Sequence, residues 1–405
     1  MAFLLGAVAF VVALLVSVML HEAGHLVTAK RFGMKATQYF VGFGPTLWSC
    51  RRGETEYGVK AIPLGGFVKI VGYTPLEEIP PADRERAFYR QPAGRRAIVI
   101  AAGVVVNLAF AFLLLMVMAM AIGVRVPGTA TTTVRDVSPC VPASLQAECR
   151  PGDPPSPAAA AGLRAGDRVV SLGGTPVADW SQLREAIGGA RPGQTVPVVV
   201  ERSQNGPGGP AAQRVTLRVR LASAGGHPFL GMTARVVGAG YERAGPIGAA
   251  VFAGQAMGRT LGAMGEALGG LPAAIPHLFS PDRGSTPGGQ VGSVVGATDV
   301  SGQIFASQNT WQDKLVLYLS LIVSVNIFLG ALNVLPLLPL DGGHLAIVVY
   351  GRARALAARA RGRPDPGTVD ITRLLPVTYV VVAVLIALGL LLIAADLINP
   401  LRLPQ

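Results

Sequence analysis

Two histidines and a glutamate near the N-terminus have the types and the spacing needed to bind and use a metal ion. His21, Glu22 and His25 form the pattern H-E-x-x-H near the end of an apolar run that begins at Phe3. On a helix, residues four apart share one face, so both imidazoles can bind one ion with Glu22 beside it as a general base. The alternative is a pair of core histidines on an amphipathic helix. Polar groups in a membrane-length apolar helix are costly, however, unless they serve a function.

A second group of polar and helix-breaking residues lies in a later apolar run and comprises Asn326, Asn333, Pro336, Pro339, Asp341 and His344. The prolines predict an interrupted helix, and irregular backbone at membrane depth is tolerated where it lines a protein cavity. Asp341 lies eleven residues before Arg352, and His21 lies nine residues before Lys30. Both are therefore predicted to lie about 15 Å from the same membrane boundary, at about 1.5 Å per residue.

The equal depth allows Asp341 to join His21 and His25 in one metal site. Two imidazoles and one carboxylate with an open fourth position are typical of a catalytic zinc site. The alternative for Asp341 is a helix-capping role at the interruption. We expect His344 to pack in the core or to support a ligand rather than to bind the metal.

The composition indicates a polytopic α-helical membrane protein. Of the 405 residues, 51% are hydrophobic and only 14% are charged. Four apolar runs are long enough to span a bilayer. The first run has no preceding basic residue and no small-residue cleavage site, so it is predicted to be a retained span rather than a signal peptide.

The basic residues predict the topology. They follow the first apolar run, beginning at Lys30, and they separate the third run from the fourth, at 352–363. The positive-inside rule places both segments in the cytoplasm and both termini outside it. The net charge of +12 does not indicate nucleic-acid binding, because no basic motif has interleaved aromatic residues and much of the charge flanks apolar spans.

The stretch 126–232 alternates short β-rich runs with Gly/Pro turns and predicts an extracytoplasmic α+β domain. Within it, 158–174 and 177–186 resemble the core of a PDZ domain. Such a domain takes an extended peptide by strand addition; the alternative is a plug that only excludes bulky molecules. Cys140 and Cys149 lie in this stretch, where an oxidising compartment permits a disulfide, although two free thiols are the alternative.

The stretch 240–306 is rich in Gly, Ala and Pro, and its helical part is predicted to be an amphipathic helix on the outer face rather than a fifth span. The expected division is a first transmembrane helix (1–30), a cytoplasmic segment with a membrane-associated hairpin (31–96), a second transmembrane helix (97–123), an extracytoplasmic PDZ-like domain (126–232), an extracytoplasmic linker with an amphipathic helix (233–313), a third, kinked transmembrane helix (314–350), a cytoplasmic basic loop (351–373) and a fourth transmembrane helix (374–397).

Together, H-E-x-x-H, the later Asn333-x-x-Pro336 with Leu340-Asp341-Gly342, and one PDZ-like domain resemble the site-2 protease family of intramembrane zinc metalloproteases. The actinobacterial members with a single PDZ domain, which regulate sigma-factor signalling, are the most similar. Further matches are 41–44 and 62–69, which resemble the membrane-associated loop and hairpin of the family. Gly103 and Asn107 resemble its Gly-Pro-x-x-Asn motif, with Val104 in place of the proline.

The resemblance implies Zn²⁺ as cofactor and a location in the bacterial inner membrane. The implied substrates are single-span membrane proteins, namely anti-sigma factors, after a first extracytoplasmic cut by another protease. It also implies that Asn333 donates to the scissile carbonyl or its oxyanion; a structural hydrogen bond in the kink is the alternative. The hairpin residues implied to bind substrate are Gly65, Gly66 and Phe67, and the residues expected to support the site are His344, Asn107 and Asn326.

Two other classes of protein remain as alternatives. A catalytically silent metal-binding membrane scaffold with a PDZ module would have lost Glu22, which is present. A transporter with an accessory domain would show paired broken helices in matching halves, and no internal repeat is visible in the sequence.

Overall fold

The computed structural model describes residues 1–73, 77–142, 149, 152–203, 212–280, 283–284, 286, 288–364, 367, 369 and 374–401. The chain forms two compact units. One comprises Met1–Gly123 and Arg243–Gln405, and the other comprises Val124–Glu242. The second unit is therefore inserted into the first between two of its helices.

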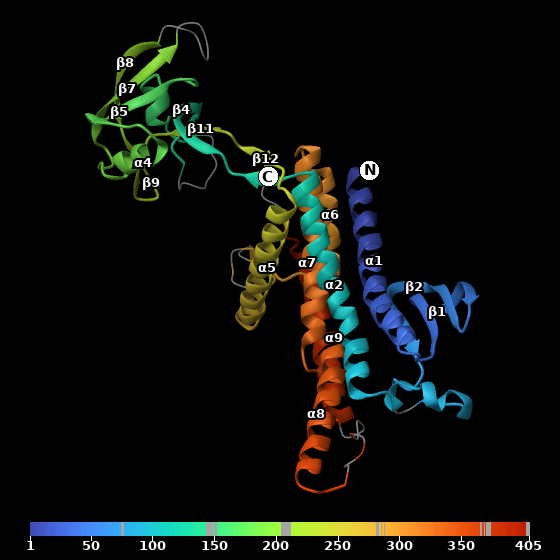
Figure 1. Ribbon diagram of the computed structural model, residues 1–405. Coiled ribbons are helices and arrows are strands. Elements are labelled where there is room, and N and C mark those ends of the chain that lie inside the picture. The colour runs from blue at the N-terminus through green and yellow to red at the C-terminus, as the bar shows by residue number, and fades with distance from the viewer. Residues whose placement is uncertain are drawn as a thin grey trace. The chain divides into compact units, whose positions relative to one another are not determined.

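The first unit is mainly helical (Figure 1). Its helices are α1 (Ala2–Arg31), α2 (Ala93–Ala121), α5 (Pro246–Ala274), α6 (Val294–Ala306), α7 (Trp311–Val334), α8 (Asp341–Ala360) and α9 (Leu375–Ile398), with short 3₁₀ turns at Pro81–Arg86, Phe88–Arg90 and Ile275–His277. Among the described residues, α1, α2, α7 and α9 are long and apolar enough to cross a membrane. The polytopic membrane class predicted from the composition is thus confirmed.

Small and polar residues hold α1, α2 and α7 together. A Cβ at Gly24 of α1 would lie 2.6 Å from the carbonyl oxygen of Ala102 in α2, so these helices approach to backbone contact. Buried Asn326 of α7 donates to the Ser17 hydroxyl of α1 at 2.9 Å. Apolar burial does not drive helix association in lipid, so close packing and interhelical hydrogen bonds must do so.

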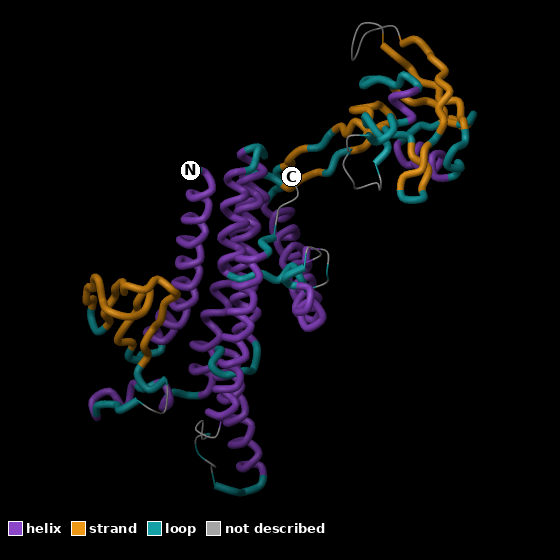
Figure 2. The backbone as a smooth tube through the Cα atoms, turned by 180° about the vertical axis from the view of Figure 1, so that it is seen from behind, coloured by secondary structure: helices purple, strands orange, loops and turns teal. Residues whose placement is uncertain are grey.

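A small sheet lies beside α1 (Figure 2). It is built from two long strands, β1 (Ala36–Arg52) and β2 (Thr55–Ile70). Tyr39 pairs with both Tyr57 and Val68, so each strand bends back and the first part of β1 lies between two parts of β2. The end of β2, residues 66–70, therefore forms one edge of the sheet.

The third apolar run is two helices rather than one kinked helix. α7 ends at Val334 and α8 begins at Asp341. Pro336 and Pro339 lie between them, and neither can donate a backbone hydrogen bond to continue a helix. α8 then extends to Ala360, beyond the end of the predicted span at residue 350. Residues 370–373, at the end of the predicted basic loop, lie outside the described part of the chain.

The stretch 240–306 contains α5 and α6, and its second half is fixed to the end of α9. The carboxylate of Asp396 in α9 forms an ion pair with Arg283, and it also accepts hydrogen bonds from the backbone and hydroxyl of Ser293. Both charged side chains are almost fully buried. The Ser301 hydroxyl of α6 donates to the carbonyl oxygen of Gly6 in α1 at 2.8 Å, so α6 joins α9 to the start of α1.

The second unit is a β-sheet with two short helices, α3 (Pro157–Ala160) and α4 (Trp180–Gly188). Its main sheet has the order β11-β4-β5-β7-β8. The strands are β3 (Val124–Val126), β4 (Thr129–Val137), β5 (Arg168–Leu172), β6 (Thr175–Pro176), β7 (Thr195–Ser203), β8 (Ala212–Arg220), β9 (Ala222–Ala224), β10 (His227–Phe229), β11 (Met232–Val237) and β12 (Gly240–Glu242). Leu183 of α4 packs into an apolar core with the buried valines of the sheet.

Cys140 and Cys149 form a disulfide, one of the two alternatives that the sequence left open.

The first and last strands of the second unit pair with each other. β3 and β12 are antiparallel, with Val126 opposite Gly240. The chain thus enters and leaves the domain through one two-stranded neck. The sheet and helices agree with the predicted α+β composition of this stretch.

Candidate metal centre

α1 carries the H-E-x-x-H residues on an unbroken helix. His21 and His25 are 8% and 5% exposed, and their Nε2 atoms are 3.2 Å apart. Residues four apart on a helix lie one above the other, so this approach follows directly from the spacing. The two imidazoles converge on one point from the same face of α1.

Asp341, the first residue of α8, completes the group. Its Oδ2 atom lies 3.0 Å from Nε2 of His21 and 3.2 Å from Nε2 of His25. The helix interruption makes this possible, because it turns the start of α8 toward α1. Gly342 and Gly343 follow at once, and a Cβ at either would collide with backbone atoms of 334–338. Only glycine permits this tight return of the chain.

The three side chains fit a zinc ion. Two ligands about 2.05 Å from a tetrahedral ion lie about 3.3 Å apart, close to the separations of 3.0–3.2 Å between His21, His25 and Asp341. Two imidazole nitrogens and one carboxylate oxygen are a ligand set of catalytic zinc sites, and they leave a fourth position open. Oδ2 of Asp341 is buried without a hydrogen-bond donor among the described residues, as expected of an atom that binds a cation.

Helix α2 packs against both imidazoles. The carbonyl oxygen of Val99 lies 2.7 Å from Nδ1 of His25. A carbonyl can only accept, so Nδ1 of His25 carries the proton and its Nε2 lone pair faces Asp341. Gly103 is packed against both rings: a Cβ there would lie 2.5 Å from Nε2 of His25 and 2.7 Å from Nε2 of His21. The absence of a side chain at Gly103 therefore makes room for the two imidazoles.

Glu22 connects the centre to the sheet. Its Oε2 atom accepts a hydrogen bond from the backbone N–H of Val68 at 3.1 Å. Val68 belongs to the edge segment 66–70 of β2. A carboxylate beside the metal ligands thus also contacts the edge of a β-sheet, where an extended peptide can pair.

The predicted hairpin residues lie close to α1. A Cβ at Gly66 would collide with the end of the Met19 side chain, two residues before His21, and would lie 3.0 Å from the carbonyl oxygen of Phe40. Gly65 has a positive φ of 121°, which favours glycine. Phe67 stacks on Phe40, with ring centroids 5.8 Å apart. The Tyr39 hydroxyl donates to the Met19 carbonyl oxygen at 2.6 Å and fixes the sheet to α1.

The remaining predicted residues are not part of the group formed by His21, His25 and Asp341. Asn333 lies in the last turn of α7, and its amide donates to Leu329 at 3.0 Å within the same helix. Asn107 of α2 is fully buried, and neither of its amide atoms has a partner among the described residues. The ring of His344 packs against that of Tyr73, with centroids 5.0 Å apart. The role predicted for His344, packing in the core or supporting a ligand, stays a prediction.

Three contributions to the centre had not been predicted from the sequence. The Val99 carbonyl and the Val68 N–H are backbone groups, which leave no signal in residue types. Gly103 had been noted only as part of a motif, and its steric role becomes visible once α1 and α2 are packed. The contact between Ser17 and Asn326 had a weak signal in the sequence, because Ser17 is a polar residue in an apolar run, one turn before His21.

Comparison with known proteins identifies the family. Residues 9–363 match peptidase family M50. Over the full length of both chains, the protein is 39% identical to zinc metalloprotease Rip1 of Mycobacterium tuberculosis and 36% identical to zinc metalloprotease Rip1 of Mycolicibacterium smegmatis. The resemblance predicted from the motifs is confirmed: this chain belongs to peptidase family M50, the site-2 protease family.

Proposed function

We propose that this protein is an intramembrane zinc endopeptidase in which His21, His25 and Asp341 hold the zinc ion and Glu22 is the general base. The convergence of two imidazole nitrogens and one carboxylate oxygen within 3.2 Å carries this proposal. When bound, zinc supplies Lewis-acid chemistry: it polarises a carbonyl group and acidifies a water molecule. Membership of family M50 and the four membrane-length helices support cleavage within the bilayer.

Glu22 performs the proton transfers. Its carboxylate takes a proton from the attacking water and returns it to the nitrogen of the departing amine. The hydrogen bond from the Val68 N–H holds one carboxylate oxygen in place. His25 is kept in one tautomer by the Val99 carbonyl oxygen, so its Nε2 remains free to bind the ion.

The edge segment 66–70 presents the substrate. A transmembrane helix has its backbone hydrogen bonds satisfied internally, so the scissile region must unwind before it can be cut. In an edge strand alternate residues point their N–H groups the same way, so Gly66 and Ile70 share the direction of Val68. An extended substrate paired along this edge would pass Glu22, and the glycine at 66 keeps that edge close to α1.

The proposed substrates are single-span membrane proteins, with anti-sigma factors as the class implied by the family. We further propose that 126–232 is a PDZ-like domain, and that this domain and both termini lie on the extracytoplasmic side. The apolar core around α4 and the disulfide support that assignment, and the basic residues flanking α1 and α2 support the orientation. A folded domain inserted in the chain between α2 and α5 would exclude substrates whose outer part has not been shortened.

The test is Glu22→Gln in the purified full-length protein, assayed on a model membrane peptide in vesicles. Glutamine keeps an oxygen that can accept from Val68 but cannot take a proton. We expect full zinc content and a loss of turnover of about 10²–10⁴-fold. The matched control is Glu85→Gln, at an exposed position, which should leave turnover unchanged. Near-normal turnover of the Glu22 variant would contradict the assigned role.

A further inference from the structure

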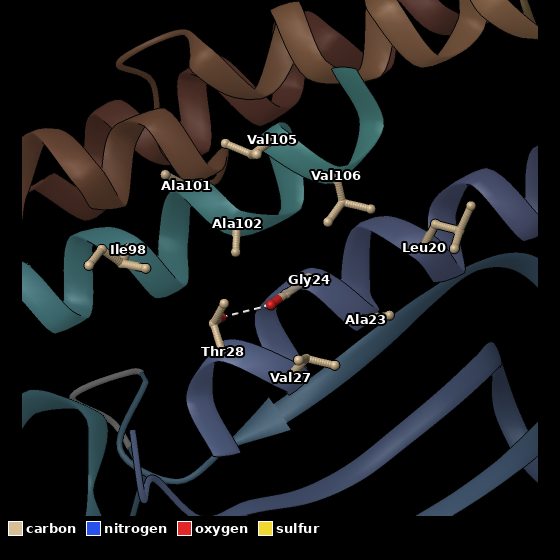
Figure 3. A pocket seen from close by; sticks show the side chains of 10 residues that line it. All are labelled: Leu20, Ala23, Gly24, Val27, Thr28, Ile98, Ala101, Ala102, Val105 and Val106. Carbon is tan, nitrogen blue, oxygen red and sulfur yellow. Dashed lines mark hydrogen bonds between the residues drawn. The ribbon is translucent and has the colours of Figure 1, made fainter. Parts of the chain in front are cut away.

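Between α1 and α2, on the surface of the helical unit, lies an apolar groove of about 520 Å³. Figure 3 shows its walls. The lining residues are Leu20, Ala23, Gly24, Val27 and Thr28 of α1 and Ile98, Ala101, Ala102, Val105 and Val106 of α2. The only side-chain hydroxyl among them, that of Thr28, already donates to the carbonyl oxygen of Gly24 at 2.7 Å. The groove thus offers apolar contact over about 12 Å of each helix.

Both walls end in an arginine at the same end of the groove. Arg31 follows Val27 and Thr28 by four and three residues, so it continues their face of α1 by one turn. Arg95 precedes Ile98 by three residues and continues the face of α2 in the same direction. The Arg95 guanidinium lies 5.7 Å from the ring centroid of Phe32, which places it beside the end of α1.

Neither arginine forms an ion pair with another described residue. Both side chains are exposed. Two cations at the end of an apolar, membrane-exposed groove match an amphiphile with an acidic head and a long apolar tail. We propose that this groove is a binding site for an anionic glycerophospholipid, with an acyl chain along α1 and α2 and the phosphate between Arg31 and Arg95.

A substrate helix is a poorer fit to the same groove. His21 and His25 lie on the other side of the α1–α2 contact, against Val99 and Gly103 of α2. The contact between Gly24 and Ala102 closes the floor between them and the groove. A peptide in the groove could not reach His21 or His25. The lining also offers no unpaired polar group for a peptide backbone, whereas an acyl chain needs none.

The experiment counts lipids retained by the full-length, zinc-loaded protein in native mass spectrometry. The probes are phosphatidylglycerol, which is anionic, and phosphatidylcholine, which has no net charge. We expect the wild type to prefer phosphatidylglycerol and the double variant Arg31→Gln/Arg95→Gln to lose that preference by roughly thirtyfold. The control Arg51→Gln/Arg52→Gln removes two exposed charges at the end of β1 and should keep the preference. Equal losses in both double variants would reduce the effect to general charge and overturn the proposal.

A second variant tests the groove itself. Val27 lies at its rim and is 63% exposed, so Val27→Trp should fill the groove from outside without removing a charge. We expect loss of bound phosphatidylglycerol with normal zinc content, and the same from Val105→Trp on the opposite wall. Retention of the lipid by both variants would overturn the proposal. So would loss of peptide cleavage by Val27→Trp with unchanged zinc content in vesicles of phosphatidylcholine alone, because the groove would then hold substrate.

Discussion

Gly103→Ala tests whether the steric fit between α2 and the imidazoles sets the metal site. The added Cβ would lie 2.5 Å from Nε2 of His25 and 2.7 Å from Nε2 of His21. Ordinary contact begins at 3.4 Å, so the nearer nitrogen must move by about 0.9 Å, or α2 must move away from α1. Neither adjustment is small, because Gly24 already holds the two helices at backbone contact.

The size of the effect follows from that displacement. Functional geometry generally has to be held within about 0.5 Å, and a misplacement of about 1 Å can lower turnover about 10²-fold. Disturbing the support of a metal ligand typically lowers metal affinity about 10–100-fold. We therefore expect Gly103→Ala to release zinc to a chelator at least about tenfold faster and to cut a model peptide about 10²-fold more slowly.

The same helix offers a matched control. Gly94 also lies in α2, and a Cβ there would meet nothing within 4 Å. Both Gly→Ala changes raise helix propensity by up to about 1 kcal/mol, so propensity cannot explain a difference between them. Zinc content by mass spectrometry and peptide cleavage in vesicles are measured for both variants. Stoichiometric zinc with wild-type chelator resistance and turnover in Gly103→Ala would refute the steric argument.

Three further outcomes are expected. Asp341→Ala should lower zinc content as well as cleavage, since it removes a ligand; tight stoichiometric zinc in this variant would make Asp341 a helix cap. Asp396→Asn should destabilise the protein by about 3–5 kcal/mol, because it leaves Arg283 buried and uncompensated, and an unchanged thermal unfolding midpoint in detergent would argue against this. Replacing 127–239 by a two-residue Asn-Gly turn should be tolerated, because Val126 and Gly240 are already paired across the neck. That variant should keep its zinc and its cleavage of short peptides, and it should also cut substrates with an intact outer domain; loss of short-peptide cleavage would instead make the domain a recruiter.

The grouping of His21, His25 and Asp341 was predictable because it depends on residue types and on distance along a helix. His21 and His25 needed only the four-residue spacing, and Asp341 needed only a common depth relative to the basic residues. In the structure α1 is one continuous helix, and the three side chains meet beside it. The four membrane-length helices were predictable for a similar reason, since bilayer thickness fixes both their length and their composition.

Other features depend on contacts that no residue type announces. The tautomer of His25 is set by the carbonyl of Val99, and the orientation of Glu22 by the N–H of Val68. The buried pair of Arg283 and Asp396 joins residues 113 positions apart. Here an arginine in a Gly/Pro-rich stretch had no sequence pattern to indicate a partner in the last span. Such pairings are decided by tertiary packing.

The α1–α2 contact links the metal site to the proposed lipid site. Gly24 and Gly103 are the positions at which a side chain would force the helices apart or displace a ligand. On one side of this contact lie the imidazoles, and on the other lies the groove whose floor is Gly24 and Ala102. Because the contact is at backbone distance, it has no compressible side chain to absorb a change. Any bound group that separates or joins the outer walls of α1 and α2 must therefore also change the space that Gly103 leaves for His21 and His25.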